Sequence, residues 1–248
     1  MANKSRAVLE SVLRAHQLDR TLTTSLPEQA PRDSAAVVPF GLEALDVSLA
    51  GGVPRGQLST IAGSRSSGRT TLLLQLLGTA TRRGEWVALV DTFDRADVES
   101  FVRAGLVQTR CLWIRGRALS DASAIPGRVA DAMVARALKS WHLVLQAGGF
   151  GAVALDLGDV PPAVLARIPF TTWLRVQRAI EGSEIAGVVL ATRPIATSAG
   201  GVALLVEGTP RWTGVVGRNR RFEGIEVRVR GRASGRLVAV EARVTVEA

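Results

Sequence analysis

The sequence predicts an α/β protein in which a mostly parallel β-sheet is covered by helices on both faces. Short, continuously apolar segments such as 58–63 and 186–192 alternate along the chain with longer segments of helical periodicity. Strands that are apolar at nearly every position are typical of a parallel sheet buried on both faces. Regular alternation of such strands with helices is typical of crossover connections within one sheet.

The elements of this core follow one another from residue 40 onward. The expected strands are 58–63, 85–91, 111–114, 151–157 and 186–192, and the expected helices are 70–84, 94–104, 121–147 and 163–181. Gly84 ends the first of these helices, as glycine commonly does at a helix C-terminus.

The N-terminal region is predicted to be a separate segment. Residues 4–16 carry an apolar stripe at helical spacing, and residues 21–38 are rich in turn formers without periodicity. We therefore expect a helix and linker over 1–38, used for docking or oligomerisation, and a core over 39–248. The alternative is that the helix packs on its own core.

The C-terminal region differs from the parallel core in its patterning. Residues 224–231 and 237–246 alternate apolar and polar side chains, and the turn between Gly231 and Gly235 separates them. This pattern predicts an antiparallel hairpin with one solvated face.

Composition excludes several classes of protein. The 248 residues are 47% hydrophobic and 21% charged, which is typical of a globular chain. A single cysteine, Cys111, excludes a disulfide framework and a cysteine-based zinc cluster, and two histidines leave little for a histidine metal site. The sequence has neither a signal-like apolar stretch near its start nor an 18-residue apolar run, so we expect a cytoplasmic protein without a membrane partner.

The charge balance is basic and the basic residues are almost all arginine. Lysine and arginine total 31 against 22 acidic residues, a net charge of +9, and only Lys4 and Lys139 are lysines. Residues 208–248 alone carry nine arginines and four glutamates. This excess favours an anionic partner, nucleic acid first, although GC-rich codon usage would give the same preference for arginine.

A glycine-rich loop joins the strand 58–63 to the helix that follows it. The loop comprises Gly63, Ser64, Arg65, Ser66, Ser67, Gly68, Arg69, Thr70 and Thr71. It follows the phosphate-loop pattern G-x-x-x-x-G-K-[ST] in the required strand–loop–helix context, except that arginine replaces the lysine. Backbone N–H groups of such a loop converge on phosphate oxygens, and the helix N-terminus adds about half a positive charge. ATP is therefore a candidate ligand of residues 63–71.

Two side chains are candidate magnesium ligands beside this loop. The Thr70 hydroxyl stands at the motif's metal position, and Asp156 ends the apolar strand 151–157. The alternative for Asp156 is a capping or turn role. Arg69 is longer and more planar than lysine, so it could hold phosphate from a shifted position or fold out to solvent. The loop could also be a remnant of the fold that binds no nucleotide.

The segment 40–71 resembles the bacterial RecA recombinase family. The resemblance rests on the S-S-G-x-T-T sequence of the loop and on the G-G-[LV]-P-x-G turn at 51–56. It continues more weakly at Gly200–Leu204, which is similar to the family's G-G-N-A-L segment. The resemblance implies a RecA-like P-loop core, with the C-terminal hairpin as its last strands.

Several positions that the resemblance marks as functional are changed in this chain. The changed residues are Arg69 for the nucleotide lysine, Phe93 for the glutamate that activates water, Ser100 for the tyrosine that stacks on adenine, and Thr192–Arg193 for an Asn-Gln pair whose glutamine senses the γ-phosphate. Asp97 matches an aspartate near the adenine. Phenylalanine cannot accept a proton or orient a water, so the resemblance implies a degenerate ATPase without a catalytic residue.

A RecA-like chain without the catalytic glutamate is similar to the ImuA family of translesion-synthesis accessory proteins. This resemblance implies a role in the SOS response to DNA damage, within a mutasome whose partners are the recombinase RecA and an inactive Y-family polymerase homologue, and allows a homo-oligomer. Two alternatives remain open. One is an active ATP-dependent recombinase in which Asp91 or Asp94 replaces the glutamate, and the other is a nucleotide-sensing regulator without DNA contact.

DNA contact, if made, is expected at arginines near the C-terminal hairpin and after the strand 186–192. The candidates are Arg193, Arg211, Trp212, Arg218, Arg220 and Arg221. Trp212 could stack on a base, or it could pack within a strand. The hairpin arginines could equally form an ordinary solvated face.

Overall fold

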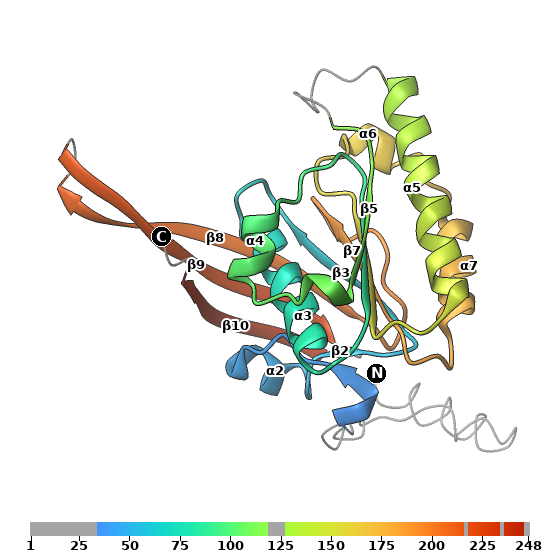
Figure 1. Ribbon diagram of the computed structural model, residues 1–248, viewed down its shortest axis with the longest axis horizontal. Coiled ribbons are helices and arrows are strands. Elements are labelled where there is room, and N and C mark those ends of the chain that lie inside the picture. The colour runs from blue at the N-terminus through green and yellow to red at the C-terminus, as the bar shows by residue number, and fades with distance from the viewer. Residues whose placement is uncertain (1–33, 119–126, 216–217, 234–235, 246–248) are drawn as a thin grey trace, which may run out of the picture. The chain divides into compact units, whose positions relative to one another are not determined.

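The computed structural model describes residues 34–118, 127–215, 218–233 and 236–245 (Figure 1). The chain divides into two units, Met1–Pro31 and Arg32–Ala248, and the described residues all belong to the second. The helix predicted over 4–16 lies outside the described residues, so its docking role stays a prediction.

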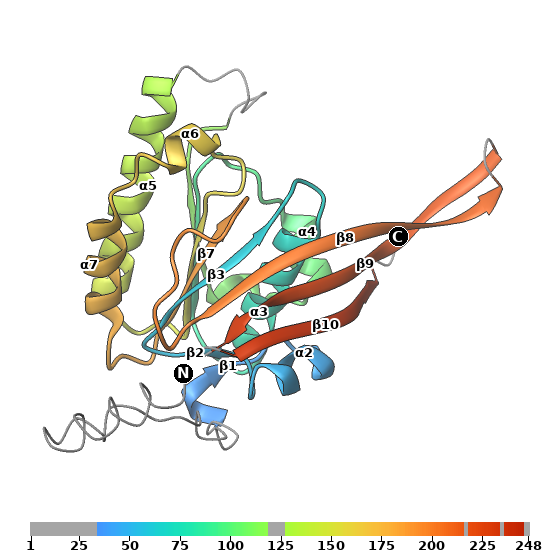
Figure 2. The ribbon, with the colours of Figure 1, turned by 180° about the vertical axis from the view of Figure 1, so that it is seen from behind.

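An eight-stranded sheet forms the centre of the described unit (Figures 1 and 2). Its strand order is β10-β9-β8-β3-β7-β6-β4-β5. The strands are β3 (Leu58–Gly63), β4 (Val87–Asp91), β5 (Cys111–Arg115), β6 (Ala152–Asp156), β7 (Ala186–Ala191), β8 (Val202–Val215), β9 (Arg218–Ala233) and β10 (Arg236–Thr245). The strands from β8 to β5 are parallel to their neighbours, whereas β8–β9 and β9–β10 pair antiparallel.

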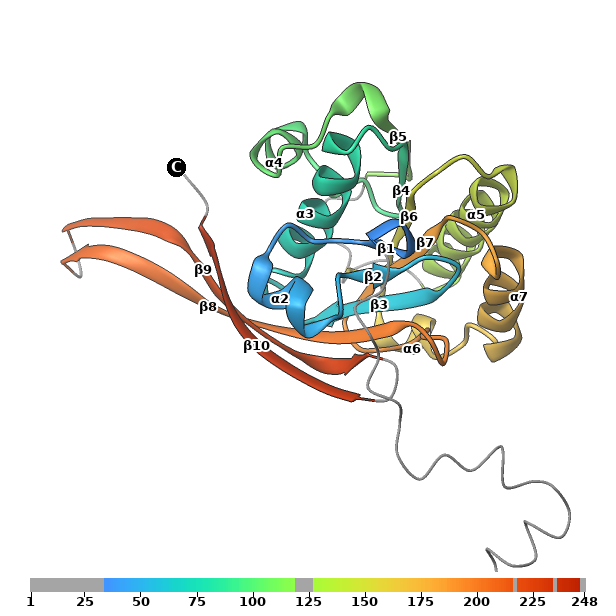
Figure 3. The ribbon, with the colours of Figure 1, turned by 90° about the horizontal axis from the view of Figure 1, so that it is seen from below.

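Helices cover both faces of this sheet, as the sequence predicts (Figure 3). One face carries α2 (Glu43–Ser48), α3 (Arg69–Arg82) and α4 (Val98–Arg103), and the other carries α5 (Gly127–Ala147), α6 (Pro162–Leu165) and α7 (Phe170–Ile180). The α/β class, the mostly parallel sheet and the C-terminal antiparallel hairpin are thus confirmed.

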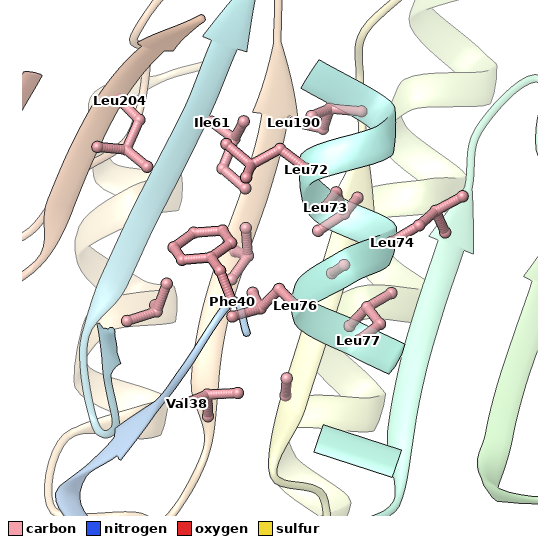
Figure 4. Close-up of a cluster of buried hydrophobic side chains, with 14 of the residues drawn as sticks. Val38, Phe40, Ile61, Leu72, Leu73, Leu74, Leu76, Leu77, Leu190 and Leu204 are labelled. Carbon is pink, nitrogen blue, oxygen red and sulfur yellow. The ribbon is translucent and has the colours of Figure 1, made fainter. Parts of the chain in front are cut away.

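The alternation of side chains along β6 shows how one strand serves two cores. Ala152 and Ala154 belong to the hydrophobic cluster on the α3 side, whereas Val153 and Leu155 belong to the cluster on the α5 side. On the α3 side, side chains from β3, β7 and β8 meet a run of leucines on α3 (Figure 4). Full burial of one such leucine contributes about 1.5–3 kcal/mol, so α3 is fixed firmly at the end of the loop that precedes it.

Two predicted elements have different boundaries in the structure. The single helix expected over 163–181 is two helices, α6 and α7, because Pro169 interrupts it: a proline disfavours helical backbone at the residue before it. Within the expected linker, Val37–Val38 forms β1, which pairs antiparallel with β2 (Val53–Pro54) and is buried.

The long strand β8 was not predicted, although its hairpin partners were. Gly208 and Pro210 interrupt its apolar pattern, and both residues are uncommon inside strands. From residue 209 to 214 every side chain of β8 on either face is exposed, because the strand has passed the edge of the core. The outer parts of β8 and β9, residues 209–215 and 218–226, therefore form a two-stranded extension that we call the ribbon (Figure 2).

Among the described residues, no helix is both long and apolar enough to cross a bilayer.

Candidate functional site

The phosphate loop, residues 63–71, has a tightly turned backbone between β3 and α3. Ser66 and Gly68 have φ angles of 61° and 87°, and Gly68 is the N-cap of α3. A Cβ atom on Gly63 would lie 2.3 Å from the Ser67 hydroxyl and 2.6 Å from the Val206 carbonyl, so only glycine fits there. The loop predicted from the motif is therefore present in its expected strand–loop–helix context.

The exposure of the loop side chains changes along its length. Ser64, Arg65 and Ser66 are exposed, the segment 67–69 is buried, and Thr70 is exposed in the first turn of α3. The Thr70 hydroxyl thus stands where the motif expects a metal ligand.

Arg69 is turned inward, away from solvent. The residue is 6% exposed, and its guanidinium donates to the carbonyl oxygens of Gly63 and Gly158, the latter at 2.8 Å. It also pairs with Asp159 Oδ1 at 3.3 Å. Asp159 in turn pairs with Arg95 at 3.3 Å. The side chain that replaces the motif's lysine is therefore occupied by protein groups at the end of β3 and just after β6.

Asp156 lies at the end of β6, opposite Asp91 in the β4–β6 ladder. Its Oδ1 accepts a hydrogen bond from Gly158 N at 2.7 Å. The pKa of Asp156 is raised to about 6, chiefly by burial and also by the charges of Asp91 and Asp159, while the Gly158 hydrogen bond and Arg69 act in the opposite direction. This carboxyl group thus makes a turn contact with Gly158, and magnesium binding by Asp156 stays a prediction.

A nucleotide with its magnesium ion needs a cation free to contact phosphate and oxygen ligands free to contact the metal. The described residues contain no group of three or more His, Cys, Asp or Glu side chains placed to hold a metal. The cation of the motif is committed to two carbonyls and Asp159, and the carboxyl of Asp156 has a raised pKa. In this arrangement the loop does not fit a phosphate held by Arg69.

Replacing Asp156 by asparagine is expected to stabilise the chain at pH 7.5 by about 1–3 kcal/mol and to leave it unchanged at pH 4. Because the folded pKa of about 6 lies above the ordinary 3.8, the folded state binds this proton more tightly than the unfolded state. The contribution of this bound proton to the free energy of unfolding is complete below about pH 4 and is lost as the pH rises through about 6. Urea unfolding with EDTA at both pH values measures the difference, and a variant that gains nothing at pH 7.5 contradicts the account.

The segment after β4 contains no free carboxylate that could replace the missing glutamate. Phe93 is 3% exposed and packs in the core on the α5 side. The Asp91 carboxylate accepts from the backbone N–H groups of Arg95 and Ala96. The Arg115 guanidinium beside Asp94 holds the pKa of that carboxyl below its ordinary value. Both aspartates that could serve an active ATPase are thus already engaged.

Asp97 has a structural role in the described chain. Its carboxylate caps α4 by accepting from the Ser100 N–H and the Ser100 hydroxyl, both at 2.7 Å. Asp97 and Ser100, at the two positions that the family resemblance places near an adenine, therefore form the start of α4. Contact between Asp97 and an adenine stays a prediction.

The ribbon brings together most of the predicted DNA-binding residues. Arg211, Arg220 and Arg221 are exposed on paired strands, and Trp212 is 46% exposed. The Arg220 guanidinium lies 4.8 Å from the centroid of the Trp212 ring. Arg218 lies on β9 opposite Val215, and its side chain is outside the described atoms. The ribbon thus presents arginines around an accessible aromatic ring.

Arg193 is exposed but does not lie on the ribbon. Of the residues around it, the sequence predicted only Arg193 as a functional residue. It follows β7 and lines a cavity of about 280 Å³ with Phe170, Trp173 and Pro194. Phe170 is 71% exposed at the start of α7. Pro169 interrupts the helix that was expected over 163–181. This proline is the sequence signal that could have placed Phe170 at the start of a helix.

Comparisons with known proteins cover the first part of the described core and the region before it. Residues 16–116 match the RecA N-terminal domain family. Protein RecA of Thermus thermophilus is 38% identical over 94 residues, which are 37% of this chain and 27% of that protein. Protein RecA of Streptomyces avermitilis is 39% identical over 79 residues (32% and 21%), and that of Clavibacter michiganensis is 42% identical over 80 residues (32% and 21%).

The matched segment thus spans about a quarter of the length of these relatives. The family match over residues 16–116 includes β3, the phosphate loop and α3. The structure joins these elements to a mostly parallel sheet with an antiparallel C-terminal hairpin. The matches and the fold together support a RecA-like core in this chain.

Proposed function

We propose that this chain is a DNA-binding RecA-like accessory protein that hydrolyses little or no ATP. The observation that carries the proposal is the position of Arg69, which closes the phosphate loop with internal hydrogen bonds. A recombinase that depends on ATP needs this loop open to phosphate, whereas an adaptor needs only the fold and its surfaces.

The ribbon is the proposed DNA contact. Arg211, Arg220 and Arg221 are exposed and can neutralise phosphates without reading base edges. Trp212 offers a face on which a base can stack, and Arg220 lies against its ring. We therefore propose binding that depends on salt, prefers single strands and is indifferent to sequence, with Arg193 and Phe170 as a second contact.

The finer assignment follows the family resemblance. We propose that the chain acts as ImuA-type proteins do, in translesion synthesis after DNA damage. Its partners would be the recombinase RecA and an inactive Y-family polymerase homologue. Support comes from the RecA similarity of residues 16–116 and from Phe93, which is buried at the family's glutamate position.

Purified protein is expected to release phosphate from ATP no faster than the Arg69→Ala variant, with or without single-stranded DNA. General-base catalysis contributes about 10²–10⁴-fold, and Phe93 cannot supply it. A coupled phosphate assay measures the rate. DNA-stimulated turnover that Asp156→Ala abolishes would refute the proposal and favour an active recombinase.

The segment 1–38 is proposed as a docking or oligomerisation element of the core 39–248. A chain lacking residues 1–20 should remain folded, because the deletion stops short of the buried Val37–Val38 strand, and should lose binding to RecA or to a second copy of itself. Sedimentation and pull-down with purified RecA measure this. Full-length protein that is monomeric, with RecA binding unchanged by the deletion, would show that the helix belongs to its own core.

A further inference from the structure

A cavity lies at the edge of the sheet, with a lining that includes no residue of the phosphate loop. It has a volume of about 590 Å³ and is bounded by the carboxyl ends of β4 and β5 and by α5. Small-molecule sites are commonly 300–1,000 Å³ in volume. In open α/β sheets ligands commonly bind just beyond the carboxyl ends of the strands. The phosphate loop follows β3, which is separated from β4 by β7 and β6, so the two places are distinct.

Four arginines line this cavity. Arg115 is held in place, since it pairs with Asp94 at 2.6 Å and stacks over the Trp113 ring at 4.5 Å. The others are Arg117, Arg128 and Arg136, which make no hydrogen bond or ion pair within the described part of the chain.

The negative charge near these arginines is already committed. Among the residues that line the cavity, the one carboxylate is that of Asp91, which accepts from two backbone N–H groups and from Trp113 Nε1. The cavity therefore presents three unpaired guanidinium groups without a matching anion among the described residues. Such groups suit phosphate oxygens, because their planar forks donate two hydrogen bonds at once.

An unsatisfied polar atom lies in the wall of the same cavity. Thr92 is 2% exposed, and its Oγ1 has no hydrogen-bond partner among the described residues. A buried hydroxyl without a partner costs about 1–3 kcal/mol, so such groups usually have a water or ligand beside them. Apolar side chains, including Ile114 and Met133, provide the rest of the wall.

We propose that this cavity binds a polyphosphorylated small molecule of nucleotide size. Its phosphates would lie between Arg117, Arg128 and Arg136, and its less polar body would lie against Ile114 and Met133. Thr92 would donate or accept a hydrogen bond at the inner end. This site is independent of the phosphate loop and of the proposed DNA contact.

Isothermal titration with ADP and with pyrophosphate tests the proposal on the full chain. Both probes are expected to bind, and the Arg128→Gln/Arg136→Gln variant is expected to weaken both by about tenfold or more. Lys139→Gln is the matched control, since it removes one positive charge from the same helix outside the cavity lining. Neither Lys139→Gln nor Arg69→Ala should change the affinity by more than about twofold.

Thr92→Val provides a second and independent readout. It keeps the shape of the side chain and removes the unpartnered hydroxyl, so ADP affinity should fall several-fold while stability in urea is unchanged or improved. Absence of binding by either probe at millimolar concentration would overturn the proposal. So would loss of binding in Arg69→Ala with full binding in the cavity variants, which would locate the site in the phosphate loop. Weaker DNA binding by the cavity variants without any ADP binding would instead make these arginines part of the DNA surface.

Discussion

Replacement of Arg69 by alanine is expected to lower the free energy of unfolding by about 2–4 kcal/mol. The change removes the Arg69 donor from the buried carbonyls of Gly63 and Gly158 and leaves Asp159 with its ion pair to Arg95. The figure lies below that for a fully buried ion pair, because the Asp159 side chain is 22% exposed. Urea unfolding followed by tryptophan fluorescence measures the change.

Two further variants control for charge and for shape. Arg65→Ala removes the same charge from an exposed position of the same loop and should cost less than about 0.5 kcal/mol. Arg69→Lys retains a cation but cannot span all three acceptors, so its stability should fall between those of wild type and Arg69→Ala. Equal stability of Arg69→Ala and Arg65→Ala would show that the internal bonds of Arg69 do not hold the loop.

Simultaneous replacement of Arg211, Arg220 and Arg221 by glutamine is expected to reduce the salt dependence of DNA binding by about two units. Each phosphate contact contributes roughly 0.7 to the log–log slope on single strands, and three exposed ribbon arginines are removed. Fluorescence anisotropy of a labelled oligonucleotide measures the slope of log affinity against log salt concentration. Titrations between roughly 50 and 200 mM salt cover the range in which such slopes are seen.

The matched control removes three positive charges elsewhere. Arg83, Arg103 and Lys139 lie on or directly after α3, α4 and α5 and not on the strands of the ribbon, and their replacement by glutamine changes net charge equally. The ribbon variant should lose slope and the control should keep it. Trp212→Ala should weaken binding by about 1–3 kcal/mol with little change in slope, since stacking is uncharged. An unchanged slope in the ribbon variant would make its arginines a solvated face.

Much of the fold could be predicted because its signals are local. The β3 strand was predicted with its observed bounds from an apolar run followed by glycine, and α3 from a leucine-rich segment after the phosphate loop. These signals agree with the tertiary environment, since both elements are buried. The β9–β10 hairpin was predicted because apolar and polar side chains alternate along both of its strands, which is also a local signal.

What the sequence could not supply was the direction in which long side chains turn. Arg69 was expected either to bind phosphate or to face solvent, and its acceptors lie elsewhere in the chain, at Gly158 and Asp159. The cavity beside α5 depends likewise on Thr92 and Arg136, which are distant in sequence and meet only across the sheet edge. Such contacts between distant segments leave no periodic pattern.

We propose, above all, that this chain binds DNA through a RecA-like core whose phosphate loop is closed by its own Arg69. The most direct test is an anisotropy titration of single-stranded DNA with the full chain in EDTA, without nucleotide, repeated with ATP and Mg²⁺ while phosphate release is followed. We expect full binding in EDTA and no phosphate release when nucleotide is added. The salt dependence should be steep, and replacement of Arg211, Arg220 and Arg221 by glutamine should reduce it. Binding that arises only with ATP and Mg²⁺, accompanied by phosphate release, would contradict this proposal.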